Sequence, residues 1–475
     1  MNNLTMSTDL YQINMMYAYY KKNLDGRRAV FDVFFRKPPG GNGYAIFAGL
    51  EQVLDYIENI RFTEEDIAYL RSVYSYEDTF LEKLRNFRFT GNIAAMKEGT
   101  VVFPGEPLLR VEAPIGEAQL IETTMLTIIN HQTLIATKAA RIVEAAKGDT
   151  VLEFGLRRAQ GAEAGYYGAR AAYIGGVHAT SNIIAGRDFG IPVRGTHAHS
   201  FVQLFEHELD AFTAYSEAFP DETVLLVDTY DTLEMGIPHA IKIGLAMREK
   251  GKKLLGIRLD SGDLAYLSKE ARRMLDEAGL TDVAIVASSD LDERLIQDLK
   301  SQEAKINIWG VGTNLITSYD CPALGGVYKL AAVEKNGEWE PRLKISENPT
   351  KITNPGYKKV IRFYDRATDK PLADLIALAK EEIPQDEITI FHPLFPHKRK
   401  TLRNYRTESL LYPVIERGRR LYDPPALEEI RAYVRKQLAR FSPEIRRLVN
   451  PHEYHVDLSQ RLWDLKQTLI HQERG

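Results

Sequence analysis

The sequence has 475 residues, of which 44% are hydrophobic, and a formal net charge of −4. This length and composition predict a globular protein of two or three domains, and the charge argues against a general nucleic-acid or acidic-membrane binder. The single cysteine, Cys321, excludes an internal disulfide framework and any multi-cysteine zinc site.

The amino terminus has no basic segment followed by an apolar stretch, so no secretory signal is expected. No window approaches the ~18 consecutive apolar residues of a membrane span. Together with the lone cysteine, these features predict a cytoplasmic protein that binds neither membrane nor nucleic acid.

The first 130 residues predict a small α/β domain. Thr8 or Asp9 can cap a helix that runs to about Lys22. A strand over 29–35, a helix over 50–60, two short helices within 67–87 and a small sheet within 91–114 follow. Residues 116–147 then predict a long, mostly buried helix that ends at Gly148 and connects to the next domain.

Seven apolar runs recur between Val151 and Val333, and most stop at a cluster of polar residues. The runs start at Val151, Ile191, Thr223, Leu254, Val283, Ile306 and Val327. These spacings match one strand plus a crossover helix, and continuous apolar runs are typical of parallel strands buried on both faces. We therefore predict an irregular parallel α/β barrel over residues 131–345, with its site at the carboxyl ends of the strands. An N-terminal α/β domain (1–130) and a C-terminal α+β domain (346–475) flank it, the latter with a strand near 359–364 and mostly helix over 424–471.

The sharpest local signal is Gly195-Thr-His-Ala-His-Ser, which follows the second run. Glycine lets backbone approach a ligand, and histidine can act as a general base, a metal ligand or a phosphoryl acceptor. His197 and His199 could thus form a metal site, although no companion ligand set is evident. The alternative is one buried and one exposed histidine without function.

Two further strand ends carry carboxylates. Arg258-Leu-Asp-Ser-Gly-Asp offers a guanidinium for phosphate or carboxylate, and Asp260 could hold ribose hydroxyls or Mg²⁺. A solvated loop with a local ion pair is the alternative. Asp228 is a weaker signal, because aspartate commonly caps the following helix.

Other strand ends add anion-binding groups. Gly310-Val-Gly-Thr-Asn could cradle a phosphate with backbone N–H groups, helped by Ser288, or could be a plain tight turn. Gly155-Leu-Arg-Arg supplies two cations. This inventory suits a ligand with several phosphates, a ribose and Mg²⁺.

As a set, these motifs resemble the nicotinate phosphoribosyltransferase family. The resemblance rests on six segments in order: Thr8-Asp-Leu-Tyr-Gln, Glu153-Phe-Gly-Leu-Arg-Arg-Ala-Gln-Gly, Gly195-Thr-His-Ala-His-Ser-Phe, Arg258-Leu-Asp-Ser-Gly-Asp, Gly310-Val-Gly-Thr and Gly325-Gly-Val-Tyr-Lys-Leu. It implies a type II phosphoribosyltransferase fold and a homodimer with shared active sites. The zinc knuckle of some relatives cannot form with one cysteine.

The resemblance also implies a reaction and residue roles. Nicotinate and 5-phosphoribosyl 1-pyrophosphate would give nicotinate mononucleotide and pyrophosphate, with Mg²⁺ present and ATP hydrolysed through a phosphohistidine, in NAD salvage. The implied site is His199 as phosphohistidine, Tyr11 stacked on nicotinate, Thr196 and Arg258 on substrate, Gly312 and Thr313 on the 5′-phosphate, Arg157 lining the pocket, and Asp228 and Asp260 serving ribose or Mg²⁺. The Mg²⁺ ligands themselves stay open.

Three alternatives remain at this point. A transferase for nicotinamide or quinolinate is the nearest, and substrate competition would separate it. A non-catalytic nucleotide sensor on the same barrel would bind the ribosyl donor without releasing pyrophosphate. A metal-dependent barrel hydrolase using His197 and His199 is the most distant.

Overall fold

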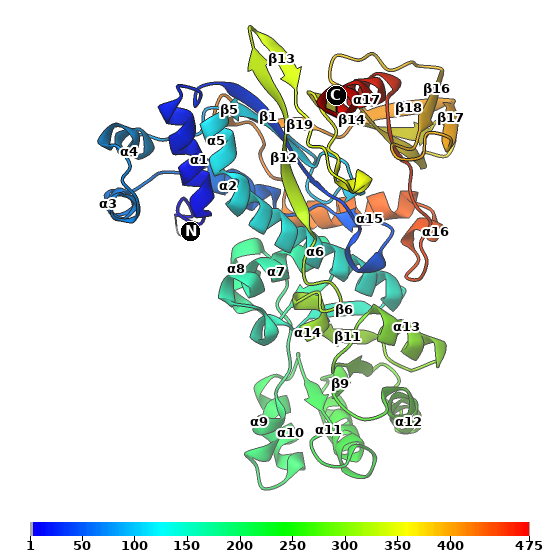
Figure 1. Cartoon of the computed structure of the whole chain (residues 1–475). Coiled ribbons are helices and arrows are strands. Elements are labelled where there is room, and N and C mark those ends of the chain that lie inside the picture. The colour runs from blue at the N-terminus through cyan, green and yellow to red at the C-terminus, as the bar shows by residue number, and fades with distance from the viewer. Residues whose placement is uncertain (1–2, 475) are drawn as a thin grey trace. The chain divides into compact units, whose positions relative to one another are not determined.

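The computed structural model describes residues 3–474, which form two compact units. One unit comprises residues 135–322, and the other combines residues 3–134 with 323–474 (Figure 1). The amino-terminal and carboxyl-terminal segments thus share one unit, and the three-domain division stays a prediction. Within the described residues, every helix is too short or too polar to span a bilayer.

The unit of residues 135–322 is built on a six-stranded parallel sheet. Its strands are β6 (Thr150–Glu153), β7 (Ala179–Thr180), β8 (Val224–Leu226), β9 (Gly256–Leu259), β10 (Ala284–Ala287) and β11 (Ile308–Val311). They lie in the order β7-β6-β11-β10-β9-β8, and every neighbouring pair is parallel. Five of the seven predicted runs therefore form adjacent strands of one parallel sheet, and the predicted irregular α/β barrel is confirmed.

The second run, from Ile191, forms no full strand. Val193 makes a single parallel bridge to Thr180 of the edge strand β7. Pro192 has no N–H for a ladder, and only its carbonyl accepts a bond, from the Thr180 N–H at 3.0 Å. The edge strand comes instead from Ala179–Thr180, a segment too short to be found from its sequence pattern.

Helices alternate with these strands, as a crossover topology requires. They are α7 (Ala162–Ile174), α8 (Ile183–Phe189), α9 (His199–Gln203), α10 (Glu208–Ala218), α11 (Ile237–Glu249), α12 (Leu264–Glu277), α13 (Glu293–Ser301) and α14 (Thr313–Ile316), with short turns η2 (Leu156–Arg158) and η3 (Thr232–Gly236). Asp263 and Asp292 cap α12 and α13 by accepting backbone N–H groups with their carboxylates.

The other unit contains antiparallel and mixed sheets. Its strands are β1 (Arg28–Phe35), β2 (Ala45–Ile46), β3 (Asn92–Ala95), β4 (Val101–Val102), β5 (Leu109–Pro114), β12 (Gly326–Lys335), β13 (Glu338–Pro341), β14 (Lys358–Asp365), β15 (Pro371–Leu378), β16 (Glu387–Phe391), β17 (Arg399–Arg403), β18 (Tyr405–Ser409), β19 (Tyr412–Glu416), β20 (Arg419–Arg420) and β21 (Val456–Leu458). A seven-stranded sheet runs β13-β12-β1-β5-β3-β19-β20, a six-stranded sheet runs β17-β16-β21-β15-β14-β18, and β2 pairs with β4.

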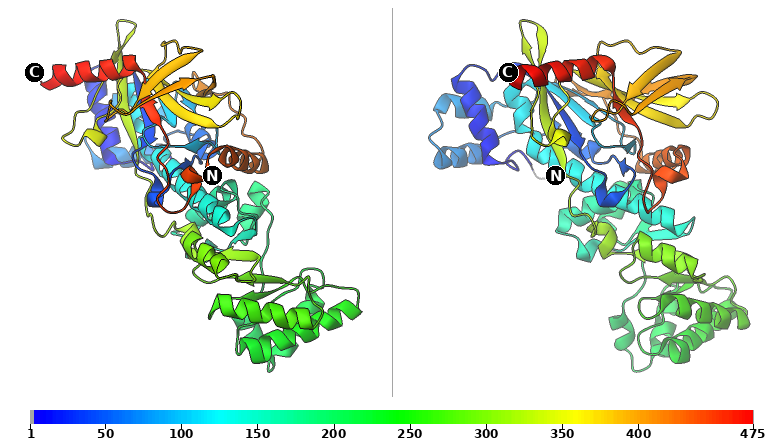
Figure 2. Two further views of the ribbon diagram at one scale, coloured as in Figure 1. Left: turned by 90° about the vertical axis from the view of Figure 1, so that its right-hand side faces the viewer. Right: turned by 45° about the vertical axis from the view of Figure 1, so that its right-hand side comes forward.

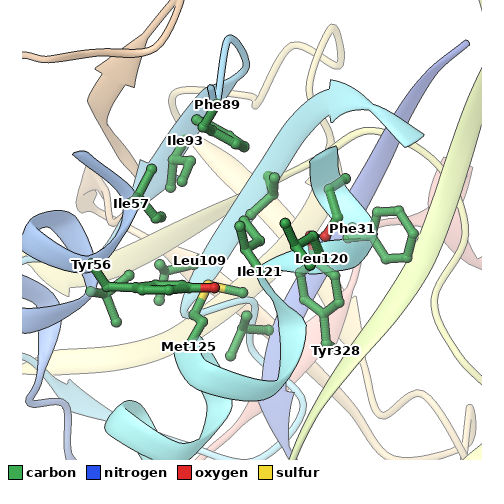
Figure 3. Packing of buried hydrophobic residues seen from close by; sticks show 14 of the residues in the cluster. Phe31, Tyr56, Ile57, Phe89, Ile93, Leu109, Leu120, Ile121, Met125 and Tyr328 are labelled. Carbon is green, nitrogen blue, oxygen red and sulfur yellow. The ribbon is translucent and has the colours of Figure 1, made fainter. Parts of the chain in front are cut away.

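The seventh apolar run was predicted as a barrel strand, and this is wrong. It forms β12, which pairs antiparallel with β1 in the seven-stranded sheet. The rings of Phe31 and Tyr328 stack there with centroids 4.6 Å apart, inside a core that also holds Tyr56 and Met125 (Figure 3). Burial of these aromatic surfaces favours pairing with β1, so an apolar run alone cannot tell the two sheets apart.

Helices of this unit agree with most of the predictions. They are α1 (Leu10–Lys21), α2 (Leu50–Glu58), α3 (Glu64–Val73), α4 (Asp78–Arg85), α5 (Ile115–Leu120), α6 (Glu122–Ala146, which continues into the other unit), α15 (Leu427–Arg440), α16 (Pro443–Arg446) and α17 (Gln460–Arg474), with turns η1 (Pro39–Gly41) and η4 (Pro349–Lys351). The predicted single helix over 116–147 is instead two, α5 and α6, separated at Ile121. Gly148 follows with a φ of 94°, as a helix stop requires.

The carboxyl-terminal segment is the predicted α+β region. The expectation of mostly helix over 424–471 missed β21, which pairs in parallel with β15 and brings the chain back into the sheet. The helix α17 (red) packs beside β15 (Figure 2).

Candidate active site

A cavity of about 380 Å³ lies within the barrel unit, at the carboxyl ends of the parallel strands. Its wall includes Arg157, Thr196, His199, Arg258 and Asp260, five of the residues predicted from the sequence. Carboxyl ends of parallel strands meet at one edge, and this brings together groups from loops far apart in the chain.

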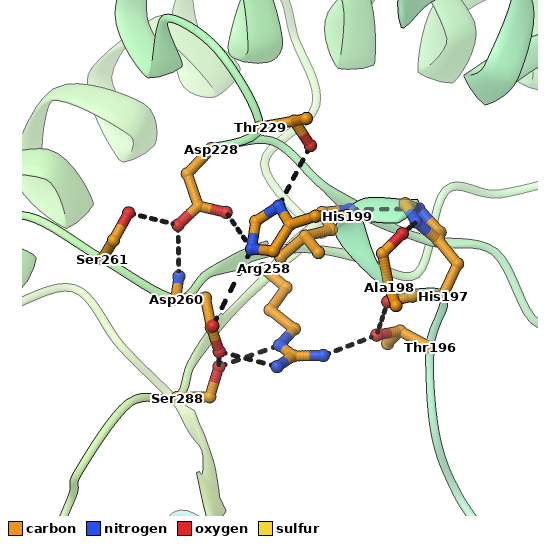
Figure 4. Close-up of polar contacts among 11 residues, drawn as sticks. Thr196, His197, Ala198, His199, Asp228, Thr229, Arg258, Asp260, Ser261 and Ser288 are labelled. Carbon is orange, nitrogen blue, oxygen red and sulfur yellow. Dashed lines mark hydrogen bonds and ion pairs between the residues drawn. The ribbon is translucent and has the colours of Figure 1, made fainter. Parts of the chain in front are cut away.

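Arg258, at the end of β9, is the centre of the polar network (Figure 4). Its Nε donates to Ser288 Oγ at 2.8 Å, Nη1 to Thr196 Oγ1 at 3.1 Å and Nη2 to Asp260 Oδ1 at 2.6 Å. Burial would raise the pKa of Asp260, but the hydrogen bond from Ser288 and the charge of Arg258 lower it below its usual value. The pair is therefore ionised, and the guanidinium is held in one orientation against the cavity.

His199 lies between a hydroxyl and two carboxylates. Its Nδ1 is 3.1 Å from Thr229 Oγ1, and its Nε2 is 3.9 Å from Asp228 Oδ1 and 3.8 Å from Asp260 Oδ2. The side chain is 38% exposed, so a ligand in the cavity can reach the ring. The position is suited to proton or phosphoryl transfer at Nε2.

Asp228 does not cap the helix that follows it, which was the alternative to a functional role. The cap of the following turn is Asp231, which accepts the N–H groups of Leu233 and Glu234. The Oδ2 of Asp228 instead accepts the Asp260 N–H at 2.8 Å and the Ser261 hydroxyl at 2.7 Å. Its Oδ1 has no hydrogen-bond partner within residues 3–474 and faces His199.

The same division of roles occurs after β9. Asp263 caps α12 through the Tyr266 N–H, which leaves Asp260 for Arg258 and Ser288. The alternative of a solvated loop with a local ion pair does not hold, because Arg258 has a side chain only 17% exposed and three separate partners.

His197 has a structural position that excludes the histidine metal pair. Its Nε2 accepts the Leu226 N–H at 3.2 Å, so that lone pair is taken by the backbone of β8. Burial lowers the pKa of His197 to about 4, which keeps the ring neutral. Since Val193 bridges to β7 and the His197 side chain bonds to β8, this one segment contacts both edge strands of the sheet.

The remaining predicted residues lie outside the Arg258 network. Arg157 lines the cavity from η2 and is exposed. Gly312 and Thr313 follow β11, between β6 and β10, and a side chain at Gly312 would come within 3.3 Å of the Phe154 carbonyl. Tyr11 is on α1 in the other unit, 48% exposed, with a pKa raised by burial and by Glu122. The role of each stays a prediction.

Three residues of the site were missed by the sequence analysis. Thr229 contacts His199, Ser261 contacts Asp228, and Phe154 lines the cavity with its ring 5.8 Å from the Arg258 guanidinium. Ser261 and Phe154 stand inside motifs that were noticed, and Thr229 directly follows Asp228, so strand-end position was the available signal.

Comparison with known proteins agrees with this geometry. Family models match in three parts: the nicotinate phosphoribosyltransferase (NAPRTase) N-terminal domain at residues 6–130, the NAPRTase family at 150–370 and the NAPRTase C-terminal domain at 357–466. The chain is 49% identical over 477 residues to a nicotinate phosphoribosyltransferase of Bacillus subtilis, covering 100% of this chain and 96% of that protein. The chain belongs to the nicotinate phosphoribosyltransferase family.

More distant members of the family give the same result. The human nicotinate phosphoribosyltransferase is 34% identical over 97% of this chain and 96% of its own length. The crystal structure of human nicotinic acid phosphoribosyltransferase superposes with a TM-score of 0.87 at 33% identity, covering 97% of this chain and 99% of that one. A nicotinate-nucleotide pyrophosphorylase of Pyrococcus furiosus shares the fold, with a TM-score of 0.70 at 24% identity over 92% of this chain and 96% of that one.

Proposed function

We propose that the chain joins nicotinate to 5-phosphoribosyl 1-pyrophosphate, releasing nicotinate mononucleotide and pyrophosphate in NAD biosynthesis. The observation that carries this proposal is that Arg258, Asp260 and His199 line one cavity of about 380 Å³, with Asp228 behind them at 3.9 Å from His199 Nε2. A volume of that size suits a small ligand rather than a macromolecule.

The pyridine nitrogen of nicotinate is the nucleophile, so glycosyl transfer needs no side-chain nucleophile. Positive charge grows on the ribose as pyrophosphate leaves, and negative charge grows on the leaving group. Arg258 is oriented by three partners, so it can stabilise developing negative charge without rearranging. Arg157 lies on the same wall and adds a second positive charge. We assign the 5′-phosphate to Gly312 and Thr313, at the amino end of the turn that follows β11.

Asp228 and Asp260 are the residues that fit Mg²⁺. The Oδ1 of Asp228 is buried without a hydrogen-bond donor, and both carboxylates face His199 Nε2. Proteins usually hold magnesium by one or two carboxylates together with substrate phosphates, so two carboxylates suffice. The ion would neutralise phosphate charge.

We further propose that ATP phosphorylates His199. When Nδ1–H donates to Thr229 Oγ1, Nε2 has a free lone pair directed toward the carboxylates. Attack on the γ-phosphorus forms an N–P bond and breaks the bond to the ADP oxygen; later hydrolysis releases phosphate. The new phosphoryl group would add roughly two negative charges beside Asp228 and Asp260, so the step should require the divalent cation.

The test is a His199→Asn variant assayed for nicotinate mononucleotide with and without ATP. We expect the variant to lose ATP stimulation and keep slow ATP-independent transfer, whereas full stimulation would refute the assignment. The exposed His207→Asn is the matched control. Competition with nicotinamide and quinolinate, which carry zero and two carboxylates, tests the substrate assignment.

The resemblance to the family also implies an assembly. We propose a cytoplasmic homodimer with shared active sites, in which Tyr11 stacks on the nicotinate ring. Tyr11 is half exposed on α1, which leaves its ring available for such a contact.

A further inference from the structure

A second cavity, of about 430 Å³, lies within the unit that combines residues 3–134 with 323–474. It is lined by segments distant in the sequence, among them β1, the loop before β14, the loop after β16 and helix α17. Phe103 and neighbouring prolines supply apolar wall. The volume and the mixed lining are those of a small-molecule site.

Lys466 on α17 is the residue in this cavity that most needs explanation. It is 5% exposed, and its Nζ contacts only neutral oxygens: Asn354 Oδ1 at 2.9 Å and the Ile352 carbonyl at 3.5 Å. Within residues 3–474 it has no ion pair. Burial, and then the charge of Lys358, lower its pKa to about 8, so most molecules at neutral pH hold an ammonium without a counter-ion.

Lys358, the other buried cation of the cavity, has a counter-ion. Its Nζ is 2.7 Å from Asp32 Oδ2, and both residues are almost fully buried. The second oxygen of that carboxylate, Asp32 Oδ1, is buried with no hydrogen-bond donor within the described part of the chain. Asp32 therefore neutralises Lys358 and leaves Lys466 uncompensated.

His392 adds a donor on the same wall. Its Nδ1 accepts the N–H groups of Leu394 and Phe395, each at 3.1 Å, which places the proton of the neutral ring on Nε2. The cavity thus offers an unpaired cation, a ring N–H donor and an unpaired carboxylate oxygen that can accept a hydrogen bond.

We propose that this cavity binds a small organic anion that also carries a hydroxyl or amino donor. Its phosphate or carboxylate would pair with Lys466 and accept from His392, and its donor would satisfy Asp32 Oδ1. The ligand's anionic group then supplies the counter-ion that Lys466 lacks, its donor meets the unbonded oxygen of Asp32, and the apolar wall contacts its carbon atoms. None of the residues assigned to the reaction lines this cavity.

The test measures binding of glycerol 3-phosphate to the full-length protein by calorimetry. Nicotinate mononucleotide and Mg²⁺ are present at saturation, so that the catalytic cavity is occupied. We expect one glycerol 3-phosphate per chain for the wild type, affinity lowered at least tenfold in Lys466→Met, and an unchanged value for Arg461→Met. Arg461 is an exposed cation on the same helix, so its replacement makes the same change in net charge. Uncharged glycerol should not bind.

The variant should fold, because Met keeps most of the buried stem and removes an unpaired charge. Lys466→Gln, which can still bond Asn354, is the second variant, and thermal unfolding and basal kcat/KM are measured for both. Absence of binding to the wild type, or wild-type affinity in Lys466→Met and Lys466→Gln, would overturn the proposal. A fall in basal kcat/KM of either folded variant would place Lys466 in the catalytic machinery and would also overturn it.

Discussion

Two arginine–aspartate pairs, one in each unit, have different roles: one borders the catalytic cavity and the other is buried within the fold. Arg258 and Asp260 border the catalytic cavity with side chains 17% and 28% exposed, whereas Arg362 and Asp374 are fully buried. Arg362 binds both carboxylate oxygens of Asp374, at 2.8 and 2.6 Å, and also donates to the Val101 carbonyl at 2.8 Å. The donors of Arg362 all bond to buried groups of the protein, whereas Arg258 also lines the cavity.

The difference shows that an ion pair becomes functional when its partners leave one side open to a ligand. A buried pair joins segments of the fold, here β14, β15 and the strand β4. A partly exposed pair at strand ends costs less in desolvation and can exchange water for substrate. Three substitutions test this distinction.

The largest effect on stability is expected for Asp374→Asn. The change leaves the Arg362 guanidinium buried without its counter-ion, which should lower the free energy of unfolding by about 3–5 kcal/mol. Urea unfolding measures it, with Asp260→Asn as the matched variant, for which a loss below about 1 kcal/mol is expected. Equal losses in the two variants would remove the contrast between the pairs.

Arg258→Met should show the reverse, with folding largely kept and catalysis lost. Loss of the oriented cation should reduce kcat/KM by about 10²–10³-fold, as for removal of one preorganised donor. Arg258→Lys should recover little, because an ammonium cannot hold three partners in the guanidinium geometry. The control is Arg342→Met, which removes a half-exposed arginine paired with Glu340; activity near the wild-type value in Arg258→Met would contradict the proposed role.

A smaller effect on stability is expected at His197. This buried polar group lies in the catalytic unit and, like Arg362, should contribute to folding. Its folded pKa of about 4 lies below the unfolded value, so the unfolded chain binds more protons between about pH 4 and 6.5. Stability contributed by the neutral ring is therefore present above pH 6.5 and declines as the pH falls toward 4, by at most about 1.4 kcal/mol per pH unit.

His197→Met should flatten this dependence, measured as unfolding free energy at a series of pH values. The exposed His471→Asn on α17 is the control and should keep the wild-type slope. An unchanged slope in His197→Met would show that burial does not hold the ring neutral.

Much of the catalytic site could be predicted because its residues lie close to apolar runs in the sequence. Arg258, Asp260, Asp228 and His199 stand immediately after apolar runs or in the segment that follows one, and parallel strands place such positions at one edge. Which aspartate caps a helix could not be predicted. Asp260 and Asp263 lie in the same loop, and only the positions of Arg258 and Tyr266 decide between them.

The wrong predictions have a related cause, which is contact between segments far apart in the sequence. The run from Val327 has the composition of a barrel strand, yet it pairs with β1, since its aromatic face is buried against Phe31. The contact of His197 with the edge strand β8 depends on a hydrogen bond from Leu226, 29 residues away, that no local pattern indicates.

The sequence by itself determined the alternation of apolar runs and polar ends, and with it the parallel sheet and its reactive edge. Local order along the chain is enough for that, because burial and strand direction act on neighbouring residues. Tertiary structure decided which sheet the run from Val327 joined and which carboxylates kept an oxygen without a hydrogen bond. It also decided that Asp32, Asn354 and Lys466 line one cavity. Those outcomes depend on packing and desolvation between distant segments, and charge without a partner becomes visible only once the chain is folded.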